Sequence, residues 1–378
     1  MKILHILKLN GIGGVQSQFE IFYNNLGAKT KSSNFIVNIG SIDCAYSLLK
    51  PFGNKYLTKV FIFLFSNDVI LHSYNNLISK KFYYLFNVIR PSNLIFHERG
   101  NAWNLDSSEK SLVAKNANLS KLIICNSEAT KIMLHKKFDV RPEKLKVIYN
   151  GVISNLMIEN AGKAHAKKSS SRFVIGYVGR LESNKGVHTL VKSMKYLDPQ
   201  YFELNIIGDG SLREELEKYS NELGLKSVSF RGRIKDAWSE MKNFDVMVVP
   251  SIREPLGNVI IEAALHKVPI IASSVDGIIE IIADNQSGIL LTPSLPVNKR
   301  FISENVPLPE FVVNVSSNNL IAPMELDSRE IAGAIEFVVS NQALVARFAE
   351  TLYSSVIDKF HIDRYIRELM QTYKEVLL

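Results

Sequence analysis

Two basic side chains lie five residues apart in a glycine-bearing stretch near the middle of the chain. Residues 176–186 read Gly-Tyr-Val-Gly-Arg-Leu-Glu-Ser-Asn-Lys-Gly, in which Arg180 supplies a planar guanidinium and Lys185 a mobile ammonium. The stretch follows an expected strand and opens an expected helix, whose N-terminus favours a bound anion. Two such cations suit a diphosphate. The alternative is that both are solvated loop charges.

Two carboxylates follow further along the chain, at Glu254 and Glu262, eight positions apart. A helix is expected to start between them, at Gly257 or Asn258, so that Glu254 precedes the helix and Glu262 lies inside it. The other residues of this helix are almost all apolar, and a charge among them is costly unless it has a partner. The pair could flank a bound phosphate, with one carboxylate on sugar hydroxyls and the other on a ribose. A place on the helix surface is the alternative for Glu262.

A third candidate is the glycine-rich stretch 10–16, which reads Asn-Gly-Ile-Gly-Gly-Val-Gln. It follows an expected strand and opens a helix, so the backbone at Gly13 and Gly14 could approach an anion closely. The dinucleotide-binding fingerprint requires another glycine where Gln16 stands. A tight turn without a ligand is therefore the alternative.

Alternating short apolar runs and amphipathic segments must position these loops, and they predict strand–helix repeats around parallel sheets. In the first half, strands are expected at residues 2–9, 35–39, 68–71, 94–97, 122–125 and 146–148. In the second half, they are expected at 172–178, 202–207, 228–231, 246–249, 270–272 and 288–291. The pattern predicts two Rossmann-like units.

The expected boundaries are a first domain over 1–155, a linker over 156–171, a second domain over 172–358 and a terminal helix over 359–378. The linker assignment depends on small and charged residues without an apolar period. The segment 293–323 carries five prolines where a doubly wound domain needs only a short connection. Long loops of this kind are usually functional or poorly ordered.

Composition limits the class of protein. The chain is 46% hydrophobic and 22% charged, with two cysteines, which is typical of globular domains in a reducing cytosol and not of a disulfide scaffold. No apolar run reaches the length of a membrane span, and His5 and Lys8 interrupt the segment that would have to be the centre of a signal peptide. We expect a cytoplasmic protein.

The net charge of +8 is unevenly distributed, because residues 1–150 hold 20 basic and 9 acidic side chains. Basic and aromatic residues alternate at 55–65 and 80–90, which suggests reversible docking on an anionic membrane surface. The alternative is that the aromatic residues are core and the lysines are solvated. Nucleic acid is not an expected partner, because no recognised module accompanies the basic residues.

Together the motifs resemble those of the retaining, nucleotide-sugar-dependent glycosyltransferases of family four. The resemblance covers most of the chain and depends on the order of its pieces: Gly13-Gly-Val-Gln, His97-Glu, Asn126-Ser-Glu, Asn150-Gly-Val, Val178-Gly-Arg-Leu with Lys185-Gly, Ile207-Gly-Asp-Gly, Phe230-Arg-Gly, Pro250-Ser, the Glu-x7-Glu pair and Asp276-Gly. It implies the α/β fold called GT-B, in which two Rossmann-like domains face each other across a cleft and a C-terminal helix returns to the first domain.

The resemblance also implies roles for single residues. Arg180 and Lys185 would bind the donor diphosphate, Glu262 the ribose and Glu254 the transferred sugar, with His97 near the donor sugar and the acceptor hydroxyl. Further donor-binding positions are Gly13, Gly14, Gly208, Ile234, Leu256, Gly257, Asn258 and Val259.

The sequence departs from the family pattern in two places. Asp276-Gly-Ile-Ile-Glu280 replaces the usual Gly-Gly-x-Pro-Glu, and the proline-bearing segment after Leu291 is longer than usual.

The implied activity is retaining transfer of a hexosyl or N-acetylhexosaminyl group from a UDP-linked donor to a glycan or lipid-linked acceptor, in cell-surface polysaccharide biosynthesis. No cofactor and no metal are expected, because no Asp-x-Asp triplet occurs in the chain. We expect the enzyme in the cytoplasm, where it could dock on the inner face of the plasma membrane. The alternatives are a nucleotide-sugar epimerase of the same architecture and a catalytically silent nucleotide-sugar-binding subunit.

Overall fold

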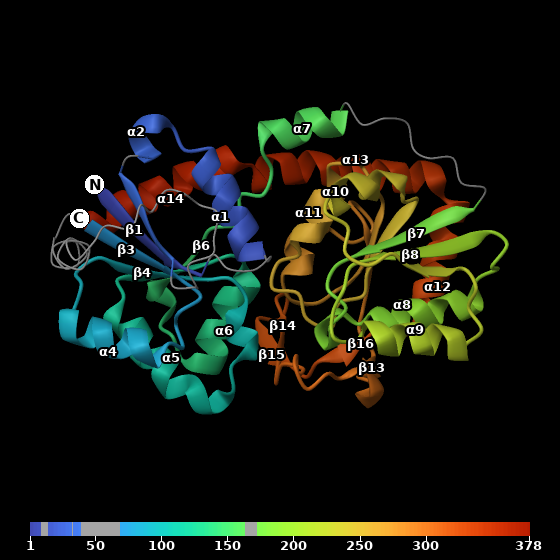
Figure 1. The fold of residues 1–378 in the computed structure, drawn as a ribbon, viewed down its shortest axis with the longest axis horizontal. Helices are drawn as coiled ribbons and strands as arrows, with labels where there is room; N and C mark the ends of the chain where they lie inside the picture. Colours follow the sequence, from blue (N-terminus) through green and yellow to red (C-terminus); the bar gives the residue numbers. More distant parts are fainter. Residues whose placement is uncertain (9–13, 32, 39–68, 163–171) are drawn as a thin grey trace. The chain divides into compact units, whose positions relative to one another are not determined.

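The computed structural model describes residues 1–8, 14–31, 33–38, 69–162 and 172–378 (Figure 1). The described residues form two compact units. Unit 1 comprises Met1–Val152 together with His361–Leu378, and unit 2 comprises Ile153–Phe360.

Unit 1 is built on a six-stranded sheet in the order β2-β1-β3-β4-β5-β6, in which every described pair of strands is parallel. All residues of β3 and β4 are buried, as expected for parallel strands covered on both faces. The strands are β1 (Lys2–Leu7), β2 (Asn34–Asn38), β3 (Val69–Tyr74), β4 (Leu94–Glu98), β5 (Leu122–Cys125) and β6 (Leu145–Val147).

Helices cover both faces of this sheet (Figure 1). One layer holds α1 (Gly14–Asn24) and α14 (Ile362–Leu377), and the short α2 (Ala28–Lys31) follows α1 in the chain. The other layer holds α4 (Lys80–Ile89), α5 (Lys110–Leu119) and α6 (Glu128–Phe138). Helix α14 buries one face at helical spacing, and its Tyr365, Leu369, Tyr373 and Val376 belong to the core of unit 1. The expected return of the C-terminal helix to the first domain is confirmed.

Unit 2 contains a second parallel six-stranded sheet, in the order β12-β11-β10-β7-β8-β9. Its strands are β7 (Phe173–Val178), β8 (Phe202–Ile207), β9 (Val228–Phe230), β10 (Val246–Val249), β11 (Ile270–Ser273) and β12 (Ile289–Leu291). One helical layer holds α8 (Val187–Ser193), α9 (Arg213–Glu222) and α12 (Ser328–Ser340), and the other holds α10 (Ala237–Glu240), α11 (Asn258–Ala264) and α13 (Gln342–Phe360). The expectation of two parallel-sheet α/β units is confirmed.

Residues 293–325, which we call the proline-bearing arm, form two small antiparallel pairs of strands. Strand β13 (Leu295–Pro296) pairs with β16 (Met324–Glu325), and β14 (Val312–Asn314) pairs with β15 (Asn319–Ile321). The segment that the sequence marks as a long loop is therefore folded onto unit 2.

The region expected to be a linker begins with helix α7 (Asn155–Gly162), and its remaining residues 163–171 lie outside the described part of the chain. At the other end of unit 2, α13 continues to Phe360, so the terminal helix begins at Ile362 and not at 359.

Among the described residues, no single helix has the length and apolar composition of a membrane span. Helices α12 and α13 meet the length and composition test only when they are taken together across a bend of 101°.

Candidate functional site

The strand order of unit 2 reverses between β7 and β10. The chain passes from β7 to β8 and β9 on one side, then returns to β10 on the other side and continues to β11 and β12. In open α/β sheets, ligands bind beyond the carboxyl ends of the strands at such a reversal. The loops that follow β7 and β10 carry Lys185 and Glu254 respectively.

The structure joins these two residues directly. Lys185 Nζ lies 2.5 Å from a carboxylate oxygen of Glu254, and the side chains are only 16% and 11% exposed. Their loops are tied together by the backbone as well, since Ile252 N–H and Arg253 N–H donate to the Asn184 carbonyl at 3.0 and 3.1 Å. An ion pair with little exposure needs good geometry to offset the loss of hydration. The ion pair and the backbone hydrogen bonds therefore fix both charged side chains at the point where the strand order reverses.

Arg180 follows β7 and is exposed. The Tyr177 hydroxyl donates to the Arg180 carbonyl at 2.9 Å, which fixes the backbone from which the guanidinium projects. Within the described residues, no hydrogen bond or ion pair engages that guanidinium. It is therefore available for an anionic ligand.

Glu262 lies half-buried in α11, beside the fully buried residues Ile260, Ile261 and Ala263. Burial raises the pKa of the Glu262 carboxyl to about 7. In the part of the chain that the structure describes, no hydrogen-bond donor or cation faces this carboxylate. A carboxylate that is desolvated without a partner is costly, so Glu262 is a good candidate for binding ligand hydroxyls.

The other donor-binding positions expected in unit 2 lie at the same edge of the sheet. Gly208 follows β8 with φ +146°, and a Cβ at this position would lie 1.8 Å from the Gly179 carbonyl oxygen, so only glycine fits. Ile234 is in the loop after β9. Leu256 is buried, and Gly257, Asn258 and Val259 form the start of α11.

The expected site residues of unit 1 have different surroundings. Gly13 lies outside the described residues, and Gly14 is the first residue of α1. His97 is fully buried in β4, and its Nδ1 faces His72 Nε2 at 3.2 Å. Its Nε2 accepts from Arg99 Nε at 3.3 Å. Since both ring nitrogens of His97 are engaged, its role near the donor sugar and acceptor stays a prediction.

His97 belongs to a row of polar rings that the sequence reasoning missed. His5, His72 and Tyr74 lie on neighbouring strands, and His5 is in register with His72. The His5 ring hydrogen-bonds Tyr74 Oη at 3.1 Å, and the rings of His72 and His97 stack with centroids 5.3 Å apart. Burial lowers the pKa of all three histidines, to about 4 for His5. The sequence signal for this row was a histidine at the fourth position of β1, β3 and β4, after three mostly apolar residues in each strand.

Arg99 was also missed. Its side chain reaches His97 and the Asn150 side-chain oxygen, the latter at 3.2 Å, while its buried Nη1 has no partner in the described residues. The row of rings therefore positions one cation at the carboxyl end of β4.

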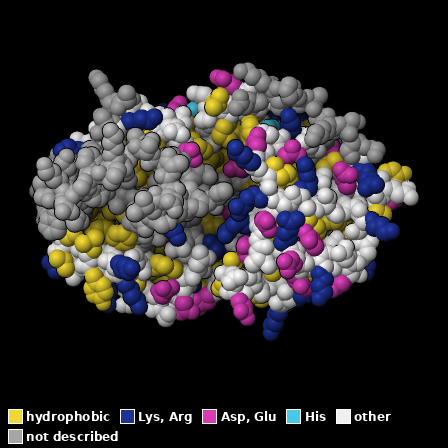
Figure 2. Space-filling view, in the orientation of Figure 1, with side chains coloured by type: hydrophobic (Ala, Val, Ile, Leu, Met, Phe, Trp, Pro, Cys, Tyr) yellow, Lys and Arg dark blue, Asp and Glu magenta, His cyan; other side chains and the backbone are white. Residues whose placement is uncertain are grey.

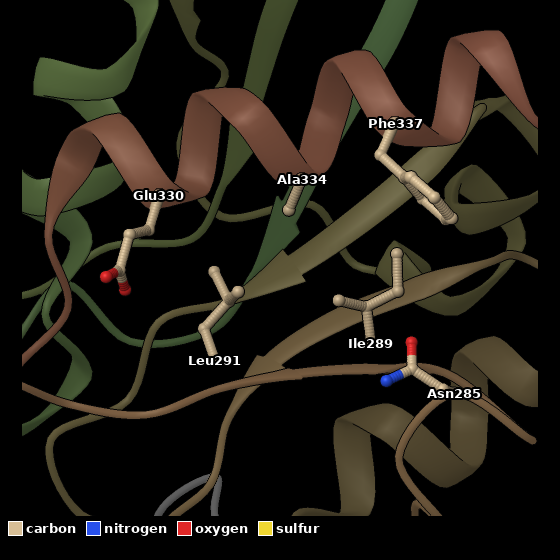
Figure 3. Close-up of a pocket in the computed structure, with 6 residues that line it drawn as sticks. All are labelled: Asn285, Ile289, Leu291, Glu330, Ala334 and Phe337. Carbon is tan, nitrogen blue, oxygen red and sulfur yellow. The ribbon is translucent and has the colours of Figure 1, made fainter.

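A cavity of about 360 Å³ lies elsewhere in unit 2, between β12 and α12 (Figure 3). Figure 3 shows Ile289 and Leu291 on the strand side, facing Ala334 and Phe337 on the helix. None of the expected site residues lines it. We therefore place the candidate site at the carboxyl ends of the unit 2 strands and not in this cavity.

Solved structures, including that of a galactosyltransferase, share this fold. HepE from Anabaena, solved with UDP and glucose, matches 99% of this chain and 100% of its own with a TM-score of 0.72 and 20% identity. The lipopolysaccharide outer core galactosyltransferase WaaB matches 100% of both chains with a TM-score of 0.65 and 18% identity. At these identities the likeness establishes the fold, which is GT-B.

Family models match both units. Residues 68–155 match the model described as Glycosyltransferase Family 4, and residues 172–299 match the model described as Glycosyl transferases group 1. The two matches together cover more than half of the chain. The chain belongs to the family-four type of glycosyltransferases.

Curated relatives match part of the chain. CapM of Staphylococcus aureus, a capsular polysaccharide biosynthesis glycosyltransferase, is 29% identical over 186 residues, which are 45% of this chain and 47% of CapM. LpsE of Rhizobium meliloti, a lipopolysaccharide core biosynthesis glycosyltransferase, is 27% identical over 188 residues, 50% of this chain and 45% of LpsE. The chain thus matches about half the length of these curated relatives.

Proposed function

We propose that this protein transfers a hexosyl or N-acetylhexosaminyl group from a UDP-linked donor to a glycan or lipid-linked acceptor in cell-surface polysaccharide biosynthesis. The Lys185–Glu254 pair at the strand reversal of unit 2 carries the proposal, because it offers a cation for the diphosphate and a carboxylate for the sugar side by side. The UDP bound to HepE and the polysaccharide role of CapM support the donor and the pathway class.

In this proposal each residue of the unit 2 site has a distinct contact. Arg180 and Lys185 bind the diphosphate, the Glu262 carboxylate accepts from the ribose hydroxyls, and Glu254 accepts from hydroxyls of the transferred sugar. The remaining donor contacts come from the backbone of Gly208, Ile234 and the start of α11.

The chemical step follows from where charge develops. The bond between the anomeric carbon and the phosphate oxygen breaks, and negative charge grows on the departing diphosphate. Cations that lie beside the diphosphate stabilise that charge as it develops. The guanidinium of Arg180 and the ammonium of Lys185 supply this stabilisation, so the reaction needs no metal in our proposal.

The acceptor hydroxyl attacks from the face that the diphosphate leaves, so the configuration of the sugar is retained. The acceptor oxygen forms the new bond to the anomeric carbon, and its proton passes to the departing phosphate oxygen. Glu254 positions the sugar and forms no covalent bond to it.

We further propose that unit 1 docks on an anionic membrane surface, the cytoplasmic leaflet of the plasma membrane, where it meets a lipid-linked acceptor. Helix α4 supports this proposal, because its outer face exposes Tyr84, Leu85 and Val88 at 68%, 43% and 83%. Lys80 and Lys81 are exposed on the first turn of the same helix. Figure 2 shows hydrophobic side chains gathered at the lower left, where Figure 1 places α4, with basic side chains beside them.

The test combines donor binding with transfer. Thermal stabilisation against a panel of UDP-, GDP- and ADP-sugars should select a UDP-sugar, and radiolabelled sugar should then pass to an acceptor extract with EDTA present. Arg180→Ala should lower transfer about a hundredfold, because it removes one preorganised charge contact of the transition state. The variant should unfold at the same temperature as the wild type, since Arg180 is exposed.

The matched control is Lys192→Ala, which removes an exposed cation from the last turn of α8, away from the strand ends. It should transfer normally. Donor binding with sugar inversion but no transfer would instead favour the epimerase alternative, and donor binding without chemistry would favour the silent subunit. An absolute need for added Mg²⁺ or Mn²⁺ would contradict the cation-based mechanism.

A further inference from the structure

The two places where the sequence departs from the family pattern touch each other in the structure. Asp276, at the start of the departing Asp276–Glu280 stretch, is fully buried. One of its carboxylate oxygens accepts from Val313 N–H at 2.7 Å, and Val313 lies in β14 of the proline-bearing arm. The other oxygen accepts from Glu254 N–H at 2.8 Å. A single carboxylate thus bridges the arm to the residue expected to contact the transferred sugar.

The backbone conformation at Asp276 is one that an aspartate can adopt. Its φ is +47°, in the left-handed region where glycine is the usual residue, and where aspartate is among the few other residues that fit readily. The following Gly277 packs tightly against the Glu254 loop, since a Cβ on it would lie 2.3 Å from the Pro255 carbonyl oxygen. Aspartate therefore fits the left-handed backbone at this position and places a charged acceptor there.

The arm is also fastened to the other side of the site. Phe301 of the arm is fully buried and stacks on His188 with ring centroids 4.3 Å apart. A carboxylate oxygen of Glu325, at the end of the arm, accepts a hydrogen bond from Nε2 of the same imidazole at 2.7 Å. Ser303 N–H donates to the Ser183 hydroxyl at 2.7 Å, two residues before Lys185. The arm is therefore attached to the loops of both members of the Lys185–Glu254 pair.

We propose that Asp276 is a positioning residue that couples the proline-bearing arm to Glu254, so that the arm sets how Glu254 meets the transferred sugar. The inference rests on the proposed function for the role of Glu254. Charge-assisted hydrogen bonds from two backbone groups hold both partners of Asp276 more firmly than neutral ones would. In this proposal the arm acts on sugar orientation through Asp276 and Glu254.

The test is Asp276→Asn, which keeps the shape and the backbone preference but presents an amide group to one of the two N–H donors. We expect kcat/KM for the nucleotide sugar to fall by about tenfold or more, because the Asn NH2 group cannot accept from a backbone N–H and one hydrogen bond to a charged group is lost. The Kd for UDP should change by less than about threefold, since the sugar is absent from UDP. A merely structural role would lower the melting temperature and weaken UDP binding in parallel with activity.

Asp284→Asn is the matched control. Asp284 is exposed and accepts from Leu290 N–H at 2.9 Å in the same unit. Within the described residues, its side chain makes no hydrogen bond to the Glu254 loop or to the arm. The same change there removes the charge from a carboxylate that also accepts from a backbone N–H, and it should leave kcat/KM and the Kd for UDP at wild-type values.

The arm side of the bridge gives an independent variant, Val313→Pro, which removes the N–H that donates to Asp276. If the bridge is responsible for the loss of activity, the double variant Asp276→Asn, Val313→Pro should have a kcat/KM no lower than that of the more severe single variant. Additive losses, or wild-type kcat/KM in Asp276→Asn, would overturn the inference. Failure of the wild-type protein to bind any nucleotide sugar would instead overturn the proposed function, so the two failures are distinguishable.

Discussion

Glu254 and Glu262 lie eight residues apart, but their surroundings affect the charges of the two carboxyl groups differently. Glu254 is paired with Lys185 at 2.5 Å, so its charge is already compensated when a donor arrives. Glu262 has no such partner in the described part of the chain, and burial raises its pKa to about 7. Near neutral pH it therefore exchanges between the protonated and the ionised form.

This difference predicts a pH-dependent affinity for UDP. A ribose with two hydroxyl donors favours the ionised carboxylate, and below pH 7 the free protein must first release a proton from Glu262. UDP should therefore bind about tenfold more weakly at pH 6 than at pH 8, as expected for one proton and a pKa of about 7. Isothermal titration calorimetry at both pH values in two buffers of different ionisation enthalpy measures the affinity and the released proton.

Glu262→Gln separates this effect from the titration of the UDP phosphate. The variant should bind UDP more weakly at pH 8 and should lose the protein-linked part of the pH dependence. An unchanged pH profile in Glu262→Gln would show that the titration belongs to the nucleotide alone.

At the scale of the element, α4 has a charge arrangement that opposes its own stability. Lys80 and Lys81 occupy its first turn, where the helix dipole disfavours cations, and no acidic residue lies there. The Ser79 hydroxyl caps the helix by accepting from Phe82 N–H at 3.2 Å. The anionic membrane surface that we propose as the partner of α4 would offset the cost of these two cations.

The double variant Lys80→Glu, Lys81→Glu tests that explanation, because it should stabilise α4 while it repels an anionic membrane. Each basic residue near such a surface contributes about 1 kcal/mol. Co-sedimentation of the wild type with vesicles should rise with phosphatidylglycerol content and fall with salt, and the variant should lose most of it. Lys192→Glu, Lys195→Glu makes the same charge change on exposed residues of unit 2 and serves as the control. Equal binding by the wild type and both variants would reject membrane docking through α4.

The elements themselves were mostly accessible from the sequence. Apolar runs bounded by polar turns placed all twelve strands of the two large sheets close to their observed bounds, because strands of a parallel sheet covered on both faces are mostly apolar. The arm was not predicted as strands, since its hairpins are short and its prolines mark loops. The ion pair of Lys185 with Glu254 and the bridge at Asp276 join residues 69 and 37 positions apart, and such contacts depend on tertiary structure.

At the scale of the whole molecule, each unit has a separate hydrophobic core. The core of unit 1 is completed by the far end of the chain, since Tyr365, Leu369 and Tyr373 of α14 pack beside residues of β1 and α1. Tyr373 also reaches the row of rings through a hydrogen bond to His72 of 2.5 Å. The core of unit 1 therefore includes residues that follow the whole of unit 2 in the sequence.

Substitution at Gly151 can test how much the packing of α14 stabilises unit 1. A Cβ there would lie 2.5 Å from Tyr365 Cβ and 3.0 Å from Ile362 Cδ1, so Gly151→Ala should push α14 away from unit 1. Overpacking of this kind costs about 1–3 kcal/mol. Gly27→Ala is the matched control in the same unit, because nothing lies within 4 Å of its Cβ position.

The two tryptophans of the chain allow each unit to be followed by itself, since Trp103 belongs to unit 1 and Trp238 to unit 2. In a Trp238→Phe background, urea unfolding followed by Trp103 fluorescence should move to lower urea with Gly151→Ala and stay in place with Gly27→Ala. In a Trp103→Phe background, the Trp238 transition should be the same with and without Gly151→Ala, because α14 contributes its side chains to the unit 1 core. Equal shifts of both transitions would mean that the units unfold as one cooperative body, and no shift in either would mean that α14 does not stabilise unit 1.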